Sequence, residues 1–279
     1  MVKAVTEYLE EYYGRVIASL DALDLDALVR RKNPYMYYAN NIGSAQEFVD
    51  TVLSAFVTSS QETFFGNVFF ERLVIAVSGG TKTLAEGSDI EVRTDTDLFV
   101  ISVKSSKDVF NSDSKKKQID HFRKLQKVAA QTGLNYRPMI GYAYTKCWKK
   151  NEDFYKEFVG QDFWEILTGD KEFYLKIVDF MGDMPDRFGD QFREAYDKAR
   201  NRMVRDFTNL YCDEDGRIDW KKIIEINSGS DGRTRLEIRW GMAGSRPAAV
   251  LQSSCSTVSA SAAFLLTESM PLRALALVL

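Results

Sequence analysis

The sequence predicts an α/β fold in which a mixed β-sheet is flanked by helices and followed by a helical C-terminal part. Residues 90–93 and 99–104 have the composition of strands and are separated by the polar turn 94–97, which indicates a β-hairpin. A helical pattern covers about 113–131, and residues 138–144 then have the composition of a third strand. Because a helix between two strands usually connects parallel neighbours, this order predicts a sheet with both strand directions.

Helical periodicity dominates the rest of the chain. Residues 3–31 carry apolar side chains on one side of a charged face, which predicts a first long helix. Ser44 and Glu47 form a capping box that predicts the start of a second helix, and a third stretch covers about 62–78. We expect helix again from about 152 to 212, packed around the sheet.

The composition is that of an ordinary globular protein. The 279 residues are 45% apolar and 28% charged, with a formal net charge of −3. This balance argues against bulk electrostatic attraction to nucleic acid but allows a local basic groove. We place one large domain at residues 1–227. Residues 228–279 contain no lysine, asparagine or tyrosine, and we interpret this tail as foreign to the domain and disordered.

The numbers and positions of cysteine and histidine limit the kinds of metal site and catalytic group that the chain could form. Cys147, Cys212 and Cys255 lie far apart, so we expect no structural zinc and a reducing, cytoplasmic location. The N-terminus lacks the apolar region of a signal peptide, and no apolar run is long enough to span a bilayer. His121 is the only histidine, which argues against histidine-based metal sites and serine-type triads. Any catalysis is therefore expected from carboxylates and lysine.

Charged residues flank the predicted hairpin. Asp89 leads its first strand, and Lys104 ends a second strand that is apolar enough to be central in the sheet. Burying a lysine is costly without a partner, so Lys104 is expected to meet an acid. Glu71 stands on the preceding helix among apolar residues, where a carboxylate also needs a role. An acid and a lysine at the end of a hairpin can hold a divalent metal ion and a water beside a phosphate.

Several short segments carry a resemblance to a known family. They are Arg31–Tyr35, Phe65–Asn67, Ala85–Asp89, Val103–Ser105, Gly160–Trp164 and Asp219–Lys222. The more specific ones read Glu-Gly-x-Asp and Gly-Gln-x-Phe-Trp. Through these segments the sequence resembles the PD-(D/E)XK nuclease superfamily and, within it, the type II restriction endonucleases of the TdeIII/PmeII-like branch.

The resemblance implies a magnesium-dependent hydrolase that cuts double-stranded DNA. Asp89 would anchor the metal ion, the backbone carbonyl of Val103 would supply a second oxygen, and Lys104 would orient and polarise the attacking water. A homodimer would cut one strand of a short palindrome with each subunit, since two-fold protein symmetry matches a two-fold site. The branch resemblance suggests a GGNCC-type site, and a cognate DNA methyltransferase would be the genetic partner in restriction–modification.

The sequence departs from the family motif at one position. Ser102 stands where the motif has Asp or Glu. Some restriction enzymes with Ser-Val-Lys take the missing ligand from the following helix, where Gln118 offers an uncharged oxygen and Asp120 is an alternative. Glu91 on the hairpin and Glu71 on the preceding helix are further candidates for the second acid. The sequence leaves this choice open.

Two other functions compete with the nuclease hypothesis. A protein that keeps the fold and loses catalysis at Ser102 would bind DNA without cutting it. A structural helical protein would use the hairpin pair as an ordinary salt bridge, and it predicts that Glu71, Asp89 and Lys104 lie far apart in space. The positions of these side chains therefore decide between a chemical and a structural role.

Overall fold

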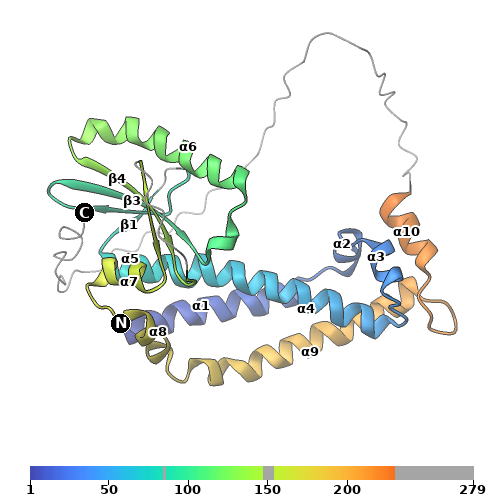
Figure 1. The fold of residues 1–279 in the computed structure, drawn as a ribbon. Helices are drawn as coiled ribbons and strands as arrows, with labels where there is room; N and C mark the ends of the chain where they lie inside the picture. The colour runs from blue at the N-terminus through green and yellow to red at the C-terminus, as the bar shows by residue number, and fades with distance from the viewer. Residues whose placement is uncertain (84–85, 147–153, 230–279) are drawn as a thin grey trace, which may run out of the picture.

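The computed structural model describes residues 1–83, 86–146 and 154–229 (Figure 1). Its α-helices are α1 (Val2–Asp21), α2 (Leu25–Arg30), α3 (Pro34–Ala39), α4 (Ala45–Phe64), α5 (Glu71–Ser78), α6 (Ser112–Ala129), α7 (Gln161–Thr168), α8 (Phe173–Met181), α9 (Met184–Tyr211) and α10 (Trp220–Ser228). The shorter helical segments are the π-helix η1 (Phe65–Phe70) and the 3-10 helices η2 (Lys107–Val109) and η3 (Ala130–Thr132). The strands are β1 (Thr81–Lys82), β2 (Ile90–Arg93), β3 (Asp97–Lys104), β4 (Asn135–Tyr142) and β5 (Lys156–Val159).

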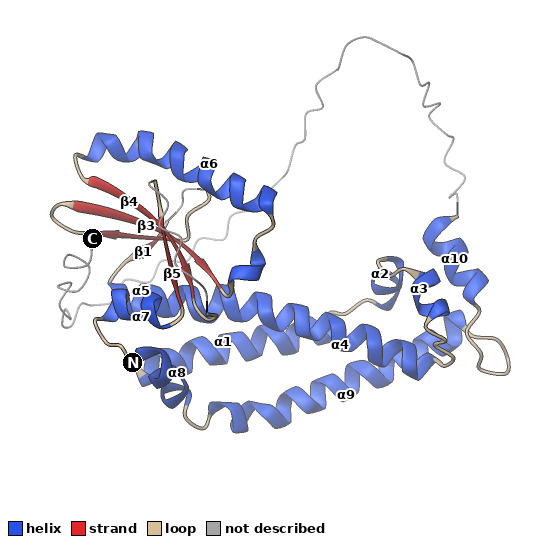
Figure 2. Ribbon diagram, in the orientation of Figure 1, coloured by secondary structure: helices blue, strands red, loops and turns tan. Residues whose placement is uncertain are grey.

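The strands form one five-stranded sheet in the order β1-β2-β3-β4-β5 (Figure 2). β1, β2 and β3 are antiparallel neighbours, whereas β4 is parallel to β3 and β5 is parallel to β4. The helix α6 lies between β3 and β4 in the chain and makes the predicted crossover. β3 is central, and every residue between its two ends is buried. The predicted mixed sheet with flanking helices is therefore confirmed.

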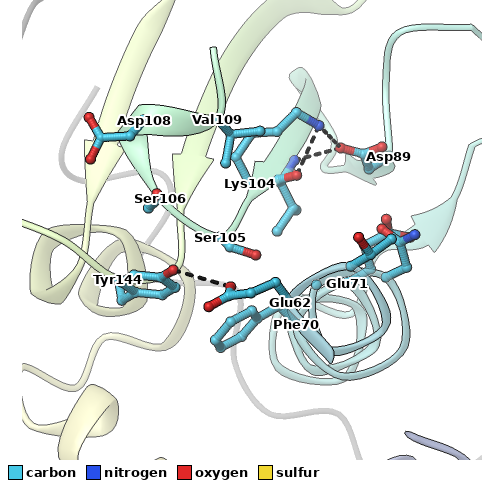
Figure 3. Close-up of a pocket in the computed structure, with 14 residues that line it drawn as sticks. Glu62, Phe70, Glu71, Asp89, Lys104, Ser105, Ser106, Asp108, Val109 and Tyr144 are labelled. Carbon is cyan, nitrogen blue, oxygen red and sulfur yellow. Dashed lines mark hydrogen bonds and ion pairs between the residues drawn. The ribbon is translucent and has the colours of Figure 1, made fainter. Parts of the chain in front are cut away.

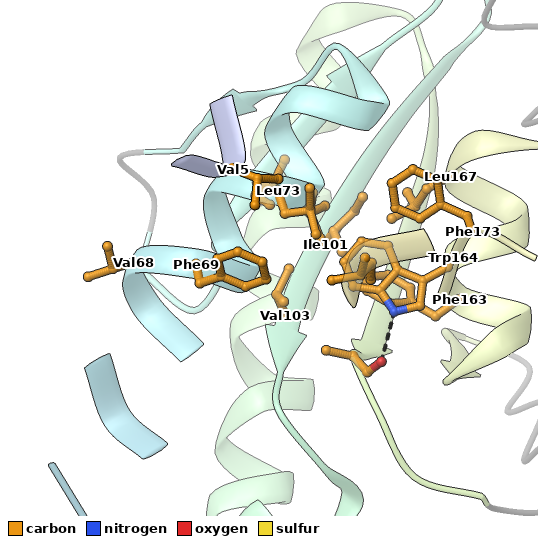
Figure 4. Close-up of a cluster of buried hydrophobic side chains, with 14 of the residues drawn as sticks. Val5, Val68, Phe69, Leu73, Ile101, Val103, Phe163, Trp164, Leu167 and Phe173 are labelled. Atoms are coloured by element: carbon orange, nitrogen blue, oxygen red, sulfur yellow. Dashed lines mark hydrogen bonds between the residues drawn. The ribbon is translucent and has the colours of Figure 1, made fainter. Parts of the chain in front are cut away.

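Helices cover both faces of the sheet. On one face, Ile101 joins an apolar cluster that includes Phe69 of η1 and Trp164 of α7 (Figure 4). On the other face, Val100 joins a cluster that includes Phe122 of α6. Successive side chains of a strand point to opposite faces, so β3 must be apolar on both sides to serve both clusters.

A helical part extends away from the sheet (Figure 1). α1, α4 and α9 run side by side and enclose a further apolar cluster, in which the rings of Phe48 and Phe207 stack with their centroids 4.6 Å apart. α2, α3 and α10 lie together at the far end of this part. α4, η1 and α5 follow one another without a break and lead from the helical part to the sheet. The helical part thereby anchors the segment that covers the hairpin.

Two predicted helix boundaries need correction. The single helix predicted for 3–31 is wrong, because α1 ends at Asp21 and Asp24 begins α2 by accepting the amide of Ala27 at 2.7 Å. A short carboxylate outside a helix end competes for backbone donors in this way. Half of the predicted capping box is present at the start of α4, where Ser44 accepts the amide of Glu47 at 3.2 Å. The other half differs from the prediction, because the Glu47 carboxylate accepts from the amide of Gly43 at 3.0 Å and not from that of Ser44.

The helix predicted for 152–212 is wrong in its first part, because residues 156–159 form β5. This segment pairs with β4, and Glu157 faces Ile140 in the parallel register. Glu157 is only 8% exposed, and a charged residue is not a typical signal of a buried strand. Its carboxylate lies 2.6 Å from Lys115 Nζ and accepts from the hydroxyl of Tyr142 at 3.3 Å. This ion pair allows a charged residue inside the sheet and explains the lysine in the first turn of α6.

The tail prediction for residues 228–279 falls almost wholly outside the described residues. Only Ser228 and Gly229, at the end of α10, are described. Cys147 and Cys255 also lie outside the described ranges. Within those ranges, no helix combines the length and the apolar character needed to cross a membrane.

Candidate functional site

The strand register brings Asp89 and Lys104 together. Ile90 pairs with Ile101 across β2 and β3, so Asp89 lies beside Ser102. The Asp89 amide donates to the Ile101 carbonyl at 3.0 Å, which extends the ladder one residue before β2. Lys104 is the last residue of β3, and its Nζ lies 3.1 Å from Asp89 Oδ2. The hairpin alone therefore makes neighbours of the acid and the lysine.

The two oxygens of Asp89 have different surroundings. Oδ2 accepts from the Val103 amide at 2.7 Å, from Lys104 Nζ at 3.1 Å and from Ser102 Oγ at 3.2 Å. Oδ1 accepts no hydrogen bond from the part of the chain that the structure describes. The side chains of Asp89 and Lys104 are 25% and 23% exposed and line a cavity (Figure 3). Asp89 is thus fixed through one oxygen and available for a ligand through the other.

The Lys104 ammonium has further neighbours. Its Nζ donates to the Val103 carbonyl at 3.0 Å, and it lies 6.0 Å from the centroid of the Phe110 ring. An aromatic face attracts a cation, so Phe110 helps to hold the ammonium near the strand end. An ammonium has three donors, and these contacts with Asp89 and Val103 leave one of them for a ligand in the cavity.

The cavity lies between the hairpin and the continuous path of α4, η1 and α5 (Figure 3). Its volume is about 580 Å³. Among the described residues, it is lined by the carboxylates Glu62, Glu71, Asp89 and Asp108, together with polar groups of Asn67, Ser105, Ser106 and Tyr144. The cavity opens to solvent beside exposed residues such as Glu62 and Asp108. Its carboxylates, hydroxyls and amide are groups that could contact a charged ligand with bound water.

Glu71 interacts with both hairpin residues across this cavity. Burial raises the pKa of Glu71 above its usual value, and the negative charge of Asp89 raises it further, while Lys82 and Lys104 lower it. Lys82 Nζ lies 3.2 Å from Glu71 Oε2. Glu71, Asp89 and Lys104 all line this one cavity, so they do not lie far apart as the purely structural alternative predicts.

The π-helix η1 explains why two carboxylates of this helical path reach one cavity. In a regular α-helix, the nine positions from Glu62 to Glu71 make about two and a half turns, which would direct them to opposite sides. A π-helical stretch uses more residues per turn, and η1 occupies Phe65–Phe70 between them. The shifted phase lets both acids line the cavity. Periodicity analysis that assumes α-helical spacing misses Glu62, and no local sequence signal marks it.

Tyr144 is a second cavity residue that sequence analysis missed. Its hydroxyl donates to Glu62 Oε2 at 3.5 Å, across the cavity from the hairpin (Figure 3). The predicted strand ended at this tyrosine, but β4 ends at Tyr142. Tyr144 therefore belongs to the loop after the strand, and the end of a parallel strand is the place where a signal could have been sought.

Gln118 of α6 contacts the hairpin segment but does not line the cavity. Its Oε1 accepts from Ser102 Oγ at 3.1 Å, and its Nε2 donates to the Gly87 carbonyl. Gln118 is 7% exposed and Ser102 is 1% exposed. Gln118 is not among the residues that line the cavity. The structure therefore places Gln118 next to the hairpin but not at the cavity surface.

The other candidates for a second acid lie elsewhere. Asp120 Oδ1 pairs with Arg123 at 3.2 Å on an outer face of α6. Glu91 Oε1 pairs with Arg93 at 2.9 Å on β2. Neither acid lines the cavity.

The donor set suits a small hard cation such as Mg²⁺. In the described part of the chain, no three His, Cys, Asp or Glu side chains cluster tightly enough to hold an ion by themselves. Mg²⁺ is commonly held by one or two carboxylates, with water and substrate phosphate completing its shell. The free Oδ1 of Asp89, the Val103 carbonyl and the nearby Glu71 are all oxygen donors. They fit an ion that keeps several waters.

Comparison with known proteins identifies the family. A model of the type II restriction endonuclease EcoO109I matches residues 1–187 of the 279 residues. The chain belongs to this family. The match covers the whole sheet and every residue named above at the cavity. The finer assignment to a TdeIII/PmeII-like branch stays a prediction, and a search among curated proteins finds no match.

The Gly160–Trp164 segment has a structural role in this family member. Gly160 has φ +52, and a Cβ there would meet the Thr145 carbonyl oxygen at 2.8 Å. The Trp164 indole donates to the Ala143 carbonyl at 2.8 Å (Figure 4). This segment packs α7 against the residues that follow β4, and so it supports Tyr144 at the cavity.

Proposed function

We propose that this protein is a Mg²⁺-dependent type II restriction endonuclease that hydrolyses phosphodiester bonds of double-stranded DNA at a short palindrome. The observation that carries the proposal is the meeting of Asp89 and Lys104 at a cavity lined by further carboxylates, in a chain of this nuclease family. A water oxygen would bond to phosphorus while one phosphorus–oxygen ester bond breaks.

Each residue would have a separate task. Asp89 Oδ1 and the Val103 carbonyl would hold the metal ion, with Glu71 as the second acid. A bound Mg²⁺ would lower the pKa of a water bound to it and would stabilise the charge that grows on the phosphate oxygens. Lys104 would direct the attacking water with the donor that Asp89 and Val103 do not use, and its charge would favour the anionic transition state.

A homodimer with a GGNCC-type site is the finer part of this proposal. Support for the dimer comes from symmetry, since one cavity per subunit would serve one strand of a palindrome. A cognate methyltransferase would protect the host DNA. The serine at position 102 supports one alternative, a member that binds DNA without cleaving it.

DNA digestion with the full-length chain tests the proposal. Discrete fragments should form with Mg²⁺ and disappear with EDTA. Asp89→Asn keeps the shape of the side chain and removes its charge, so cleavage should fall at least about 10³-fold, or about 4 kcal/mol of transition-state free energy. Asp95→Asn is the matched control, because Asp95 is an exposed acid in the turn at the other end of the hairpin. Retarded but intact DNA in every lane would favour the binding-only alternative.

A further inference from the structure

The loop that carries Asp89 is held by the crossover helix α6. Gly87 has φ +83, and a Cβ there would overlap the imidazole of His121. The Gly87 carbonyl accepts from Gln118 Nε2, one helical turn before His121. Gln118 and His121 of α6 therefore both contact Gly87, which lies two positions before Asp89.

Both polar atoms of Gln118 face hairpin groups, and Gln118 does not line the cavity. Its Oε1 accepts from Ser102 at 3.1 Å and its Nε2 donates to Gly87. An amide donates and accepts at the same time, whereas an ionised glutamate of the same length could not donate to the carbonyl. Leaving the part-buried Gly87 carbonyl without a donor is unfavourable, so these two contacts favour an amide at position 118.

Ser102 connects this contact to Asp89. Its Oγ lies 3.1 Å from Gln118 Oε1 and 3.2 Å from Asp89 Oδ2, and a hydroxyl has one proton for the two acceptors. Asp89 Oδ2 also accepts from the Val103 amide at 2.7 Å. A change at Gln118 can therefore reach the carboxylate through Ser102 and through the backbone of the loop.

We propose that Gln118 is a positioning residue that fixes Asp89 from outside the cavity, and that it replaces no metal ligand. This inference rests on the proposed function for its consequence in metal binding. Ser102 stands at the position of the missing acid, and Gln118 holds it beside Asp89. The second acid then comes from the cavity lining, where Glu71 is the candidate of the proposed function.

Amide hydrogen exchange in the metal-free full-length protein tests the positioning role directly. Gln118→Met keeps the side-chain length and removes both hydrogen bonds, so the Val103 amide should exchange faster because its acceptor Asp89 is released. Gln126→Met is the matched control, because Gln126 is exposed on the same helix. Melting temperatures of all variants report whether they fold, and Gly87→Ala perturbs the same loop from the glycine side and should also speed Val103 exchange.

Calorimetric titration with Mn²⁺ alone tests the consequence. Loss of a group that orients a ligand typically weakens metal binding about 10- to 100-fold, and we expect this for Gln118→Met and also for Gln118→Glu. Tighter Mn²⁺ binding by Gln118→Glu, or unchanged Val103 exchange in folded Gln118→Met, would overturn the inference. Faster exchange in a protein whose wild type binds no Mn²⁺ would support the positioning role and reject the proposed metal-dependent function.

Discussion

The sheet part and the helical part of this molecule use polar residues differently. In the helical part, formed by α1 to α4, α9 and α10, polar groups close helix ends: Arg202 donates to the carbonyls of Leu20 and Leu23 at 3.0 and 3.3 Å. In the sheet part, formed by the strands with α5 to α8, donors converge on the single carboxylate of Asp89. Candidate chemistry lies where antiparallel strands end, and the helices provide support.

The end of the helical part that is remote from the sheet agrees with this division. The segments at 31–35 and 219–222 belong to the family resemblance, but they lie far from the cavity, at the end formed by α2, α3 and α10 (Figure 1). There Asn227 Nδ2 donates to the Lys32 carbonyl at 3.0 Å, and the rings of Tyr38 and Trp220 lie 6.0 Å apart. These contacts join α3 to α10. Resemblance to a nuclease family therefore includes residues that serve packing.

The largest effect on stability should come from the core of the helical part. Phe207 is fully buried and stacks on Phe48, so Phe207→Ala should lower the free energy of unfolding by about 3–5 kcal/mol. Leu210→Ala, on the exposed side of the same helix, should change it by less than about 0.5 kcal/mol. Urea unfolding measures both. If the cleavage rate per folded molecule also fell, the helical part would have a role beyond support.

A change at the end of β3 should lower the cleavage rate and leave the stability nearly unchanged, which is the opposite of the effect expected for Phe207→Ala. Lys104→Met removes the ammonium and keeps the aliphatic chain, so cleavage should slow by about 10²- to 10³-fold while the fold is retained. Lys117→Met removes an exposed lysine of α6 and should leave the rate near wild type. Single-turnover cleavage with saturating DNA separates this loss from weaker binding. A wild-type rate for Lys104→Met would remove the lysine from the mechanism.

The buried ion pair of β5 should show an intermediate effect. Lys115→Met leaves the carboxylate of Glu157 buried without its cation, which should cost about 1–3 kcal/mol of unfolding free energy. Adding Glu157→Gln should recover part of this loss, because the uncompensated charge is then absent. Lys116→Met is the control on the exposed side. Equal unfolding curves for Lys115→Met and Lys116→Met would show that solvent screens the pair.

The smallest effect should come from the partly exposed pair of Asp50 and Arg200, which joins α4 to α9. The Arg200 hydrogen bond holds the pKa of Asp50 below its usual value, so the folded state favours the ionised carboxylate. This stability is present above the ordinary aspartate pKa of about 3.9 and is lost as the pH falls below it through the folded pKa. Asp50→Asn should cost at most about 1 kcal/mol at pH 7. The difference should vanish in unfolding curves at low pH, and a constant difference would exclude an electrostatic origin.

Part of the site could be predicted from the sequence because its contacts are local. The hairpin from Asp89 to Lys104 needs only strand alternation and the turn at 94–97, where the Asp97 amide donates to Thr94 Oγ1 at 2.9 Å. The crossover helix and the parallel strand that follows it are likewise a local pattern. The alternation of polar and apolar side chains depends only on neighbouring residues, so these elements can be predicted without knowledge of the fold.

Only the tertiary structure decided the rest. β5 joined the sheet because Lys115 compensates the charge of Glu157, a contact between residues far apart in the chain. The π-helix η1 changed the phase of a long helix and brought Glu62 to the cavity with Glu71. The sequence by itself determined the hairpin, the crossover helix and the parallel strand after it, and which acid and lysine meet. The groups that surround this pair depend on packing between distant segments. The phase of a helix and the burial of a charge are set by contacts with residues far away in the chain, and local sequence patterns do not identify those residues.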